Sequence, residues 1–321
     1  MRVDIHGHIV ERAFYDELGR LPGVTVERRA EGMGALKRNG SYWLPFQDAW
    51  FEPDRQLRDM DRKQIDLRVL SLSTPSVYPF APGKRAQVCR DQNDSIIATV
   101  RAHPTRFRAF ATLPLPDIED SLLELERVRH AAEVVGITIG SNLDGVALSD
   151  RSLEPLWARL NELALPVFEH PMVPVFGAAM DEFALTVRVG FMLDTSLALA
   201  RMIYAGVFER YPDFPFIVAH TGNAFLGLLE RLDNGFRHYP ECREHITRLP
   251  SEYAKRLYYD SCSFFTPAIM MAHSCVGEQQ LLFGTDYPFI DQGAGHVEQL
   301  PLPAEQIKLI LGGNALALLR I

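Results

Sequence analysis

The segment Val3-Asp-Ile-His-Gly-His8 is a short β-rich run that ends in two histidines separated by a single glycine. Runs of this kind recur along the chain, and segments with helical periodicity lie between most of them. The expected strands are Arg2–His6, Leu67–Leu72, Phe107–Leu113, Val134–Ile139, Leu165–His170, Phe214–His220, Leu257–Ser261 and Gln280–Thr285. Alternating strands and helices are typical of a parallel sheet whose strands are joined by crossover helices. Eight such units predict an α/β fold of the TIM-barrel type, a (β/α)8 barrel.

The segments between the strands carry apolar residues at helical spacing. In Asp117–Ala132 an acidic first turn precedes Leu122, Leu125 and Val128, as expected of a helix start followed by a buried face. The expected helices are Pro53–Ile65, Asp117–Ala132, Ser152–Leu163, Leu185–Val207, Ala224–Phe236, Pro267–Val276 and Pro303–Leu319. An open doubly wound sheet is the rival arrangement, but no G-x-G-x-x-G motif follows any expected strand. The barrel is therefore favoured.

The chain has 321 residues, which exceeds the roughly 250 residues of a typical barrel. We assign the surplus to an insertion after the first strand, Glu11–Glu52, which contains an aromatic cluster. The cluster comprises Tyr42, Trp43, Phe46, Trp50 and Phe51. We expect this insertion to lie over the barrel mouth, and residues 1–321 to form a single domain.

Composition and charge exclude several classes of protein. Hydrophobic residues make up 47% and charged residues 23%, which is typical of a globular protein with a sizeable core. The formal charge of −8 argues against a nucleic-acid partner, and no apolar run is long enough to predict a membrane span. Asp4, His6 and His8 lie where a secretory leader would be apolar. Four cysteines without a C-x-x-C pair predict reduced thiols and a cytoplasmic location.

Polar residues end four of the expected strands. His6 and His8 end the first strand, His170 the fifth, His220 the sixth and Asp286 the eighth. Because the C-terminal ends of the strands converge on one mouth of a (β/α)8 barrel, we expect these five side chains to meet. Polar groups at the ends of apolar strands are costly to bury without partners. The sequence therefore predicts a metal site at the mouth.

Three imidazoles and one carboxylate form a nitrogen–oxygen shell suited to one Zn²⁺ ion, with Mn²⁺, Fe²⁺ or Co²⁺ as alternatives. We take His6, His8, His170 and Asp286 as its ligands, and expect Asp286 also to move a proton. His220 is then the general acid or base near the bound water. The alternatives for His220 are a fifth ligand or a hydrogen-bond donor behind the ligands.

Three further charged residues carry weaker signals. Asp4 alternates with the two histidines along the first strand, so we expect it on their face, either orienting a ligand, neutralising the ion or forming an ordinary supporting hydrogen bond. Glu169 should face the helices. Arg231 could meet a substrate carboxylate, although an ion pair with Glu230 or Asp233 of its own helix is the default expectation.

The pattern of H-x-H on the first strand, His on the fifth and sixth and Asp on the eighth resembles the amidohydrolase superfamily. The chain is most similar to its metal-dependent decarboxylase branch, typified by α-amino-β-carboxymuconate-ε-semialdehyde decarboxylase. The supporting stretches are Asp4–His8, Trp50-Phe-Glu-Pro-Asp, Gly206-Val-Phe-Glu-Arg-Tyr-Pro, His220-Thr-Gly-Asn-Ala-Phe, Arg231-Leu-Asp-Asn, Pro250-Ser-Glu-Tyr and Gly284-Thr-Asp-Tyr-Pro-Phe. This resemblance covers nearly the whole chain. It implies a barrel, one divalent metal, a homodimer and non-oxidative loss of carbon dioxide, with His220 as the catalytic histidine and Arg231 binding the substrate carboxylate across the dimer.

Two positions depart from the pattern of that branch. Leu44 precedes Pro45 where the semialdehyde decarboxylases carry arginine, and Tyr239 stands where a second arginine is expected. Without these two arginines, the pocket has fewer guanidinium groups to bind substrate carboxylates. We therefore expect it to accept an aromatic or hydrophobic mono-acid. We expect Trp43 and Leu44 beside this substrate and Arg231 as its remaining guanidinium partner.

Three functions fit these residues. The first is a carbon–carbon lyase, a decarboxylase of a small aromatic or conjugated unsaturated carboxylic acid, with the ion as Lewis acid and His220 or Asp286 delivering the proton. The second is a hydrolase of a lactone, amide or related bond, which needs the same ligands. The third is a barrel that keeps a structural metal and serves as a binding module, and this would tolerate the loss of His220.

Overall fold

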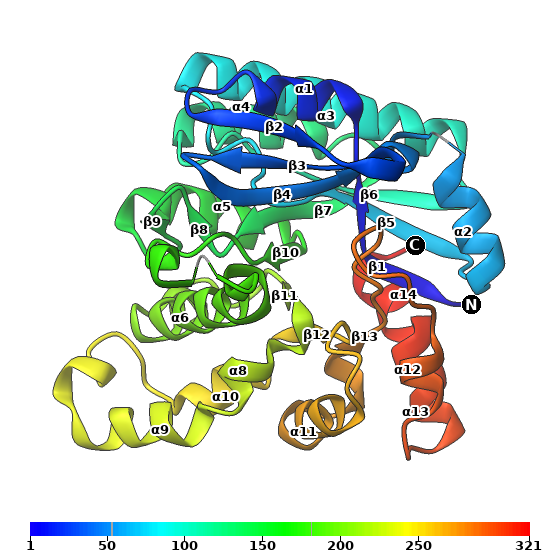
Figure 1. Ribbon diagram of the computed structural model, residues 1–321. Coiled ribbons are helices and arrows are strands. Elements are labelled where there is room, and N and C mark those ends of the chain that lie inside the picture. Colours follow the sequence, from blue (N-terminus) through cyan, green and yellow to red (C-terminus); the bar gives the residue numbers. More distant parts are fainter. Residues whose placement is uncertain (53, 181) are drawn as a thin grey trace.

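The computed structural model describes residues 1–52, 54–180 and 182–321, which form a (β/α)8 barrel (Figure 1). Within these residues one sheet contains eight strands, each parallel to its neighbours and placed in the order of the chain. They are β1 (Val3–Ile9), β5 (Leu67–Leu72), β6 (Phe107–Ala111), β7 (Val134–Gly140), β10 (Val167–His170), β11 (Phe216–Val218), β12 (Tyr258–Asp260) and β13 (Leu281–Leu282). The predicted strands and fold class are confirmed, with strand ends that differ by a few residues.

The first strand meets the segment that follows the last one, and this contact closes the barrel. The N–H of Asp286 donates to the carbonyl oxygen of His6 at 2.8 Å, and the N–H of His8 donates to that of Tyr287 at 2.8 Å. We call the paired segments 5–8 and 283–287 the closing seam. Three of the five predicted site residues therefore lie on this seam.

Two apolar cores flank the strands. The inner core fills the barrel and includes Val3, Ile5, Val69, Phe168 and Ile217, all fully buried. The larger outer core contains residues of the strands, the surrounding helices and the insertion. Because both faces of the strands are buried, their sequences are nearly continuous apolar runs.

The helices around the barrel largely follow the expected pattern. In the described residues they are α2 (Arg55–Lys63), α3 (Pro82–Ala102), α4 (Ile118–Val128), α5 (Glu154–Leu163), α6 (Phe191–Tyr204), α7 (Val207–Arg210), α8 (Asn223–Leu226), α9 (Leu229–His238), α10 (Pro250–Ala254), α11 (Thr266–Val276), α12 (Gly295–Glu298), α13 (Ala304–Lys308) and α14 (Asn314–Leu319). None of them is long and apolar enough to cross a bilayer. The first expected helix starts at Arg55, and Pro53 lies outside the described residues.

Three expected helices are divided, and the long helix α3 and the short helices α7, α10 and α12 are absent from the prediction. A π-helical turn, Thr186–Gly190, precedes α6. A second π-helical turn, Leu309–Gly313, separates α13 from α14. The segment predicted as Ala224–Phe236 forms α8 and α9. Helix α3 is not among the expected helices because the polar run Arg90-Asp-Gln-Asn-Asp94 obscures its apolar face.

The insertion after β1 has regular structure of its own. It contains α1 (Arg12–Gly19) and, in the described residues, an antiparallel sheet of β2 (Val24–Arg28), β3 (Met33–Arg38) and β4 (Ser41–Gln47). Beyond this sheet, the ring of Trp50 lies 5.4 Å from the ring of Phe289, in the loop after β13. The Phe289 ring in turn lies 5.7 Å from that of His8. The end of the insertion therefore reaches the loop that borders the histidines.

Candidate metal centre

An irregularity in β1 places its two histidines. The pairing between β1 and β5 shifts by one residue between Asp4 and Gly7. Ile5 packs in the inner core, and the next side chain, His6, also points into the barrel, so the strict alternation of a strand is broken. Asp4 faces the other way, and its Oδ2 accepts a hydrogen bond from Nε of Arg68 at 2.7 Å. The expectation that Asp4 shares a face with the histidines is therefore wrong.

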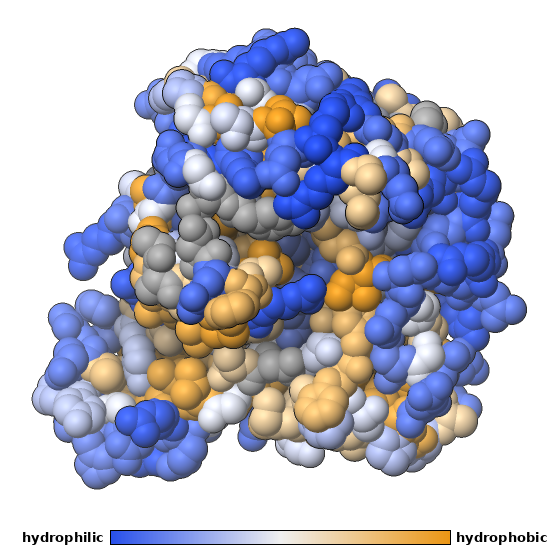
Figure 2. All heavy atoms as spheres, viewed as in Figure 1, coloured by the Kyte–Doolittle hydropathy of each residue, from blue (hydrophilic) through white to orange (hydrophobic). Residues whose placement is uncertain are grey.

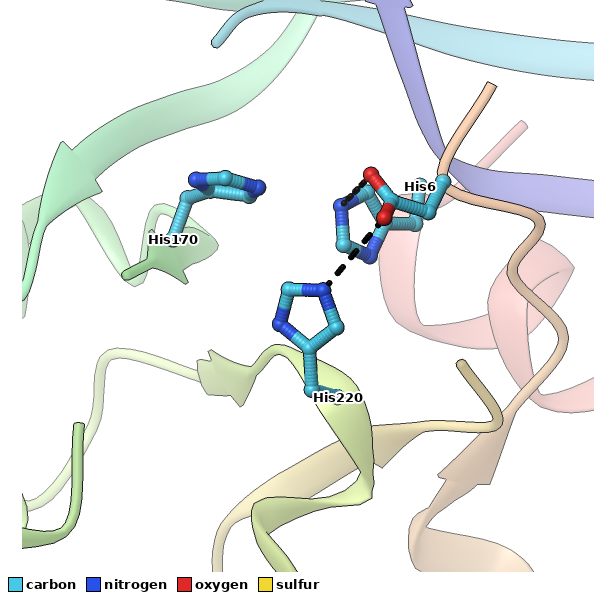
Figure 3. Close-up of side chains that lie close together, drawn as sticks. His6, His170 and His220 are labelled. Atoms are coloured by element: carbon cyan, nitrogen blue, oxygen red, sulfur yellow. Dashed lines mark ion pairs between the residues drawn. The ribbon is translucent and has the colours of Figure 1, made fainter. Parts of the chain in front are cut away.

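The structure brings all five predicted side chains together, and Figure 3 shows three of them, His6, His170 and His220, around a common point. The Nε2 atoms of His6 and His8 are 3.1 Å apart, and each lies 3.4 Å from Oδ1 of Asp286. Nε2 of His220 lies 3.5 Å from Oδ2 of the same carboxylate. The His170 ring centre is 4.7 Å from that of His8 and 5.2 Å from that of His6. Side chains from β1, β10 and the segments after β11 and β13 thus converge on one point.

The outer nitrogens of two rings fix which nitrogen faces this point. Nδ1 of His6 lies 2.5 Å from Oδ2 of Asp260, and Nδ1 of His170 lies 3.0 Å from the carbonyl oxygen of the residue that follows it. A carbonyl oxygen and an ionised carboxylate can only accept, so both rings carry their proton on Nδ1. Their Nε2 lone pairs are therefore directed at the centre of the cluster, as in metal-binding histidines.

Backbone strain is concentrated at the same place. His220, Thr221 and Asp286 have φ angles of 54°, 62° and 56°, in the left-handed region that residues other than glycine seldom occupy. Hydrogen bonds hold these conformations: the N–H of Thr221 donates to Asp260 at 2.8 Å, and the N–H of Asp286 donates to the His6 carbonyl. Such strain is found mainly at functional sites, where the surrounding structure stabilises it.

The pKa shifts divide the imidazoles into two kinds. Burial lowers the pKa of His8 and holds that of His170 well below its ordinary value, and the neighbouring imidazoles add to both effects. Burial alone would also lower the pKa of His220, but the hydrogen bond and charge of Asp286 raise it overall. Burial would raise the pKa of Asp286, yet hydrogen bonds from His220 and His8 hold it well below its ordinary value. At neutral pH, His8 and His170 are therefore neutral, whereas Asp286 is ionised.

The donor set fits a divalent ion. In the described structure, Nε2 of His170 and Nδ1 of His220 are buried and have no hydrogen-bond partner. The Nε2 atoms of His6 and His8 face each other so closely that they cannot both carry a proton. Donor atoms of His6, His170, His220 and Asp286 all lie within 4.8 Å of one another. Imidazole nitrogens and a carboxylate are the usual ligands of Zn²⁺ and also bind Mn²⁺ and Fe²⁺.

One buried carboxylate beside the imidazoles was missed from the sequence. Asp260 ends β12, is fully buried, and accepts hydrogen bonds from His6 and from the N–H groups of Thr221 and Cys262. Burial would raise the pKa of Asp260, but its hydrogen bond with His6 and the nearby histidine charges lower it overall. Its signal is similar to the one that identified Asp286, an acidic residue near the end of an apolar strand.

The structure places the other charged candidates away from the imidazoles. The carboxylate of Glu169 faces α6, where Thr195 Oγ1 donates to it at 2.8 Å, as predicted. Arg231 is exposed on α9, and no ion pair involves it within the described residues. The default expectation for Arg231 is wrong, because Arg237 instead pairs with Glu230 at 2.8 Å.

The two candidates from the insertion are buried in it. Trp43 and Leu44 lie on β4 and are 8% and 5% exposed. The guanidinium of Arg38 lies 5.3 Å from the ring centre of Trp43. Within the described residues, no hydrogen bond or ring contact links either residue to the histidine cluster, so their role beside the substrate stays a prediction.

Aromatic side chains border the cluster on two sides. The Phe289 ring lies beside His8, and the ring of Phe191, at the start of α6, lies 6.5 Å from that of His170. Both phenylalanines are half-buried. Figure 2 shows a hollow near the middle of this face, with hydrophilic atoms at its floor and hydrophobic atoms around it. The arrangement suits a small ligand with a polar end and an apolar body.

The chain is similar to several characterised proteins. Residues 3–321 match the amidohydrolase family. A 2-amino-3-carboxymuconate-6-semialdehyde decarboxylase from Dictyostelium discoideum is 29% identical over 99% of this chain and 91% of its own length. A gamma-resorcylate decarboxylase from Polaromonas is 30% identical over 84% of this chain and 87% of its own. The structure of a dihydroxybenzoic acid decarboxylase from Polaromonas, with bound manganese and the inhibitor 2-nitroresorcinol, is 26% identical, has a TM-score of 0.80, and the match covers 99% of this chain and 96% of that one.

Proposed function

The chain belongs to the amidohydrolase family, and we propose that it is a metal-dependent decarboxylase. It is a carbon–carbon lyase that removes carbon dioxide, without oxidation, from a small aromatic or conjugated unsaturated carboxylic acid. The observation that carries this proposal is the convergence of four imidazoles and one carboxylate at the barrel mouth. The names of its relatives, which decarboxylate acids of this kind, decide between a lyase and a hydrolase built on the same ligands.

We assign His6, His8, His170 and Asp286 as the residues that hold one divalent ion. Zn²⁺ is our first assignment because of the three imidazoles. Mn²⁺ is the second, since a related structure contains it. When bound, the ion supplies positive charge that binds a carboxylate and an adjacent oxygen and stabilises developing negative charge.

His220 is the general acid. Its pKa is raised by Asp286 despite burial, so its ring holds a proton near neutral pH more readily than those of His8 and His170. The bond between the ring carbon of the substrate and its carboxylate breaks, and the electron pair stays on that carbon. The carbon then takes the proton from His220, and the products are carbon dioxide and the parent compound. Asp286, 3.5 Å from Nε2 of His220, keeps this proton at the mouth.

The pocket is suited to an aromatic mono-acid. Phe289 and Phe191 flank the imidazoles and offer aromatic faces to a ring bound between them. We propose that Trp43 and Leu44 add to this apolar wall, and that Tyr239 in place of a basic residue lowers the preference for a second carboxylate.

The enzyme acts as a homodimer in which Arg231 binds the substrate carboxylate of the neighbouring subunit. The support is its position: Arg231 is exposed on α9, which projects from the barrel (Figure 1), and Leu228 and Tyr239, 39% and 56% exposed, flank this helix. All four cysteines are free thiols, which supports a reducing, cytoplasmic location.

The test is a carbon dioxide release assay on protein loaded with Zn²⁺ or Mn²⁺. The substrates are 2,6-dihydroxybenzoate, 5-carboxyvanillate and 2-amino-3-carboxymuconate semialdehyde, with lactones and anilides in parallel hydrolysis assays. We expect metal-dependent carbon dioxide release from at least one acid, and its loss in His220→Asn. Hydrolysis of a lactone or anilide without carbon dioxide release from any acid would overturn the proposal in favour of a hydrolase.

A further inference from the structure

A single buried arginine lies behind the closing seam. Arg68, on β5, is fully buried. Its Nε donates to Oδ2 of Asp4 at 2.7 Å, and its Nη1 lies 3.4 Å from Oε1 of Gln56. Its guanidinium carbon lies 4.1 Å from the ring centre of Tyr287, and its Nη2 lies 3.7 Å from Asp59. One side chain from β5 thus contacts β1, α2 and the segment after β13.

Two of these partners, Asp4 and Gln56, hold the backbone that carries predicted ligands. Asp4 accepts from the N–H of His6 at 3.2 Å and from the N–H of Thr285 at 3.0 Å. Gln56 donates its amide to the carbonyl oxygen of His8 at 3.0 Å. Arg68 is therefore linked through Asp4 to the backbone of His6 and of Thr285, which precedes Asp286. Through Gln56 it is linked to the backbone of His8.

Tyr287 connects the same guanidinium to the opposite side of the seam. Tyr287 directly follows Asp286, and its carbonyl oxygen accepts from the N–H of His8 at 2.8 Å. The ring that stacks on Arg68 is therefore part of the segment that sets the position of the Asp286 carboxylate.

Arg68 also explains the residue between the two histidines. A Cβ atom at Gly7 would lie 2.6 Å from Cγ of Arg68 and closer still to its Cδ. Real carbon atoms do not approach so closely, so any side chain at this position displaces the arginine. The φ angle of Gly7 is not positive, so its backbone conformation does not require glycine. Glycine is required because Arg68 occupies the space that a side chain would need.

We infer that Arg68 is a positioning residue for the metal centre, which fixes His6, His8 and Asp286 relative to one another across the closing seam. The inference rests on the proposed function only in taking these three residues as ligands. Fold stability alone does not require an ion pair here, because a buried pair can often be replaced as a whole by apolar side chains of similar volume, although removal of Arg68 alone leaves the buried Asp4 without this partner. What an apolar side chain cannot replace is the simultaneous contact with Asp4, Gln56 and Tyr287.

The experiment compares Arg68→Met with Arg85→Met in the full chain. Arg85 is also buried, pairs with Asp117 at 2.7 Å and donates to the carbonyl oxygen of Tyr78, but it contacts none of the seam. For each variant we would measure the dissociation constant for Mn²⁺ without substrate, the electron paramagnetic resonance spectrum of the bound Mn²⁺, and the unfolding of the metal-free protein.

We expect Arg68→Met to weaken Mn²⁺ binding by about 10- to 100-fold and to alter the Mn²⁺ spectrum, as loss of groups that orient ligands usually does. Arg85→Met should lose stability while keeping Mn²⁺ affinity and spectrum unchanged. Gly7→Ala, which leaves Arg68 in the sequence but displaces it, should weaken Mn²⁺ binding as well. In the double variant, Gly7→Ala should add little to Arg68→Met, because both act on the same contact.

Unchanged Mn²⁺ affinity in Arg68→Met, or an equal loss in Arg85→Met, would overturn the inference. If Arg68→Met does not fold, Gly7→Ala decides alone, and a wild-type Mn²⁺ affinity in that variant refutes the positioning role. Because Mn²⁺ binding is measured without substrate, a protein that decarboxylates nothing but shows these losses refutes the proposed function and leaves the role of Arg68 intact.

Discussion

Glu169 provides a quantitative test of the electrostatics behind the metal centre. It directly precedes His170 and is fully buried; its Oε1 accepts from Thr195 Oγ1 at 2.8 Å, and in the described structure its Oε2 has no partner. Burial raises the pKa of Glu169 to about 8. The negative charge of the nearby Asp194 adds to this rise, whereas the hydrogen bond from Thr195 opposes it. The carboxyl group is therefore largely protonated in the folded protein at neutral pH.

The effect on stability has a definite sign. The ordinary value for a glutamate is 4.5, so the folded state binds this proton more tightly than the unfolded chain. The contribution is fully present below pH 4.5 and is lost as the pH rises towards 8. Each pH unit within this window corresponds to about 1.4 kcal/mol, so the free energy of unfolding should fall by about 2–3 kcal/mol between pH 6 and pH 8 from Glu169 alone.

Glu169→Gln removes this term, because an amide does not titrate. Relative to the wild type, the variant should gain about 2–3 kcal/mol of stability between pH 6 and pH 8. The measurement is urea unfolding of both proteins at several pH values in chelator, so that metal binding by His170 does not contribute. Glu305→Gln, an exposed position, is the control and should show a pH-independent difference. A difference between Glu169→Gln and the wild type that is constant from pH 6 to pH 8 would refute the reasoning, because it would mean that the buried carboxyl is ionised.

The remaining predictions concern the metal and the substrate. Protein purified without chelator should contain about one divalent metal per chain, and His6→Ala should lose metal and activity together; elemental analysis well below half an equivalent, with no gain on reconstitution, would contradict this. His220→Asn should keep its metal and lose activity by roughly 10²- to 10⁴-fold, whereas a metal-free variant would make His220 a ligand. Asp260→Asn should weaken metal binding by about 10- to 100-fold, since it leaves the proton on His6 Nδ1 without its carboxylate; titration with Mn²⁺ measures it, and unchanged affinity would count against that role. Leu44→Arg should shift preference towards dicarboxylates by up to about 3 kcal/mol, and kinetics on paired mono- and dicarboxylates that reveal no shift would remove Leu44 from the pocket.

The barrel was predictable because its signal is repeated. Each strand is an apolar run buried on both faces, and eight of them at even spacing outweigh errors at any single boundary. Helix α3 was not predicted, because the polar run at 90–94 interrupts the apolar pattern of its buried face, which includes Val88 and Ile96. The sheet of the insertion was missed for a similar reason, as its strands are only partly buried and their sequences mix polar with apolar residues.

The convergence of the site residues followed from topology, but their orientation did not. Chain order and strand ends are enough to bring His170, His220 and Asp286 to one mouth. Whether His6 and Asp4 share a face depends on a one-residue shift in β1, and period-2 alternation cannot detect it. Asp260 carried a similar signal but was overlooked, because it lies inside the expected strand Leu257–Ser261 and not directly after its end as Asp286 does.

The origin of the supporting contacts links the site to the whole barrel. The ring of His6, from β1, is oriented by Asp260 from β12, and that of His8 by Ser71 from β5, 3.0 Å away. His170, from β10, has Thr74 Oγ1 at 3.2 Å from its Nδ1, and Thr74 lies just after β5. Each of these histidines is thus oriented by a residue on another strand or just after one, so the site needs β1, β5, β10 and β12 in place together. Metal binding is therefore coupled to closure of the full barrel, and a bound ion stabilises the folded chain by the free energy of its binding.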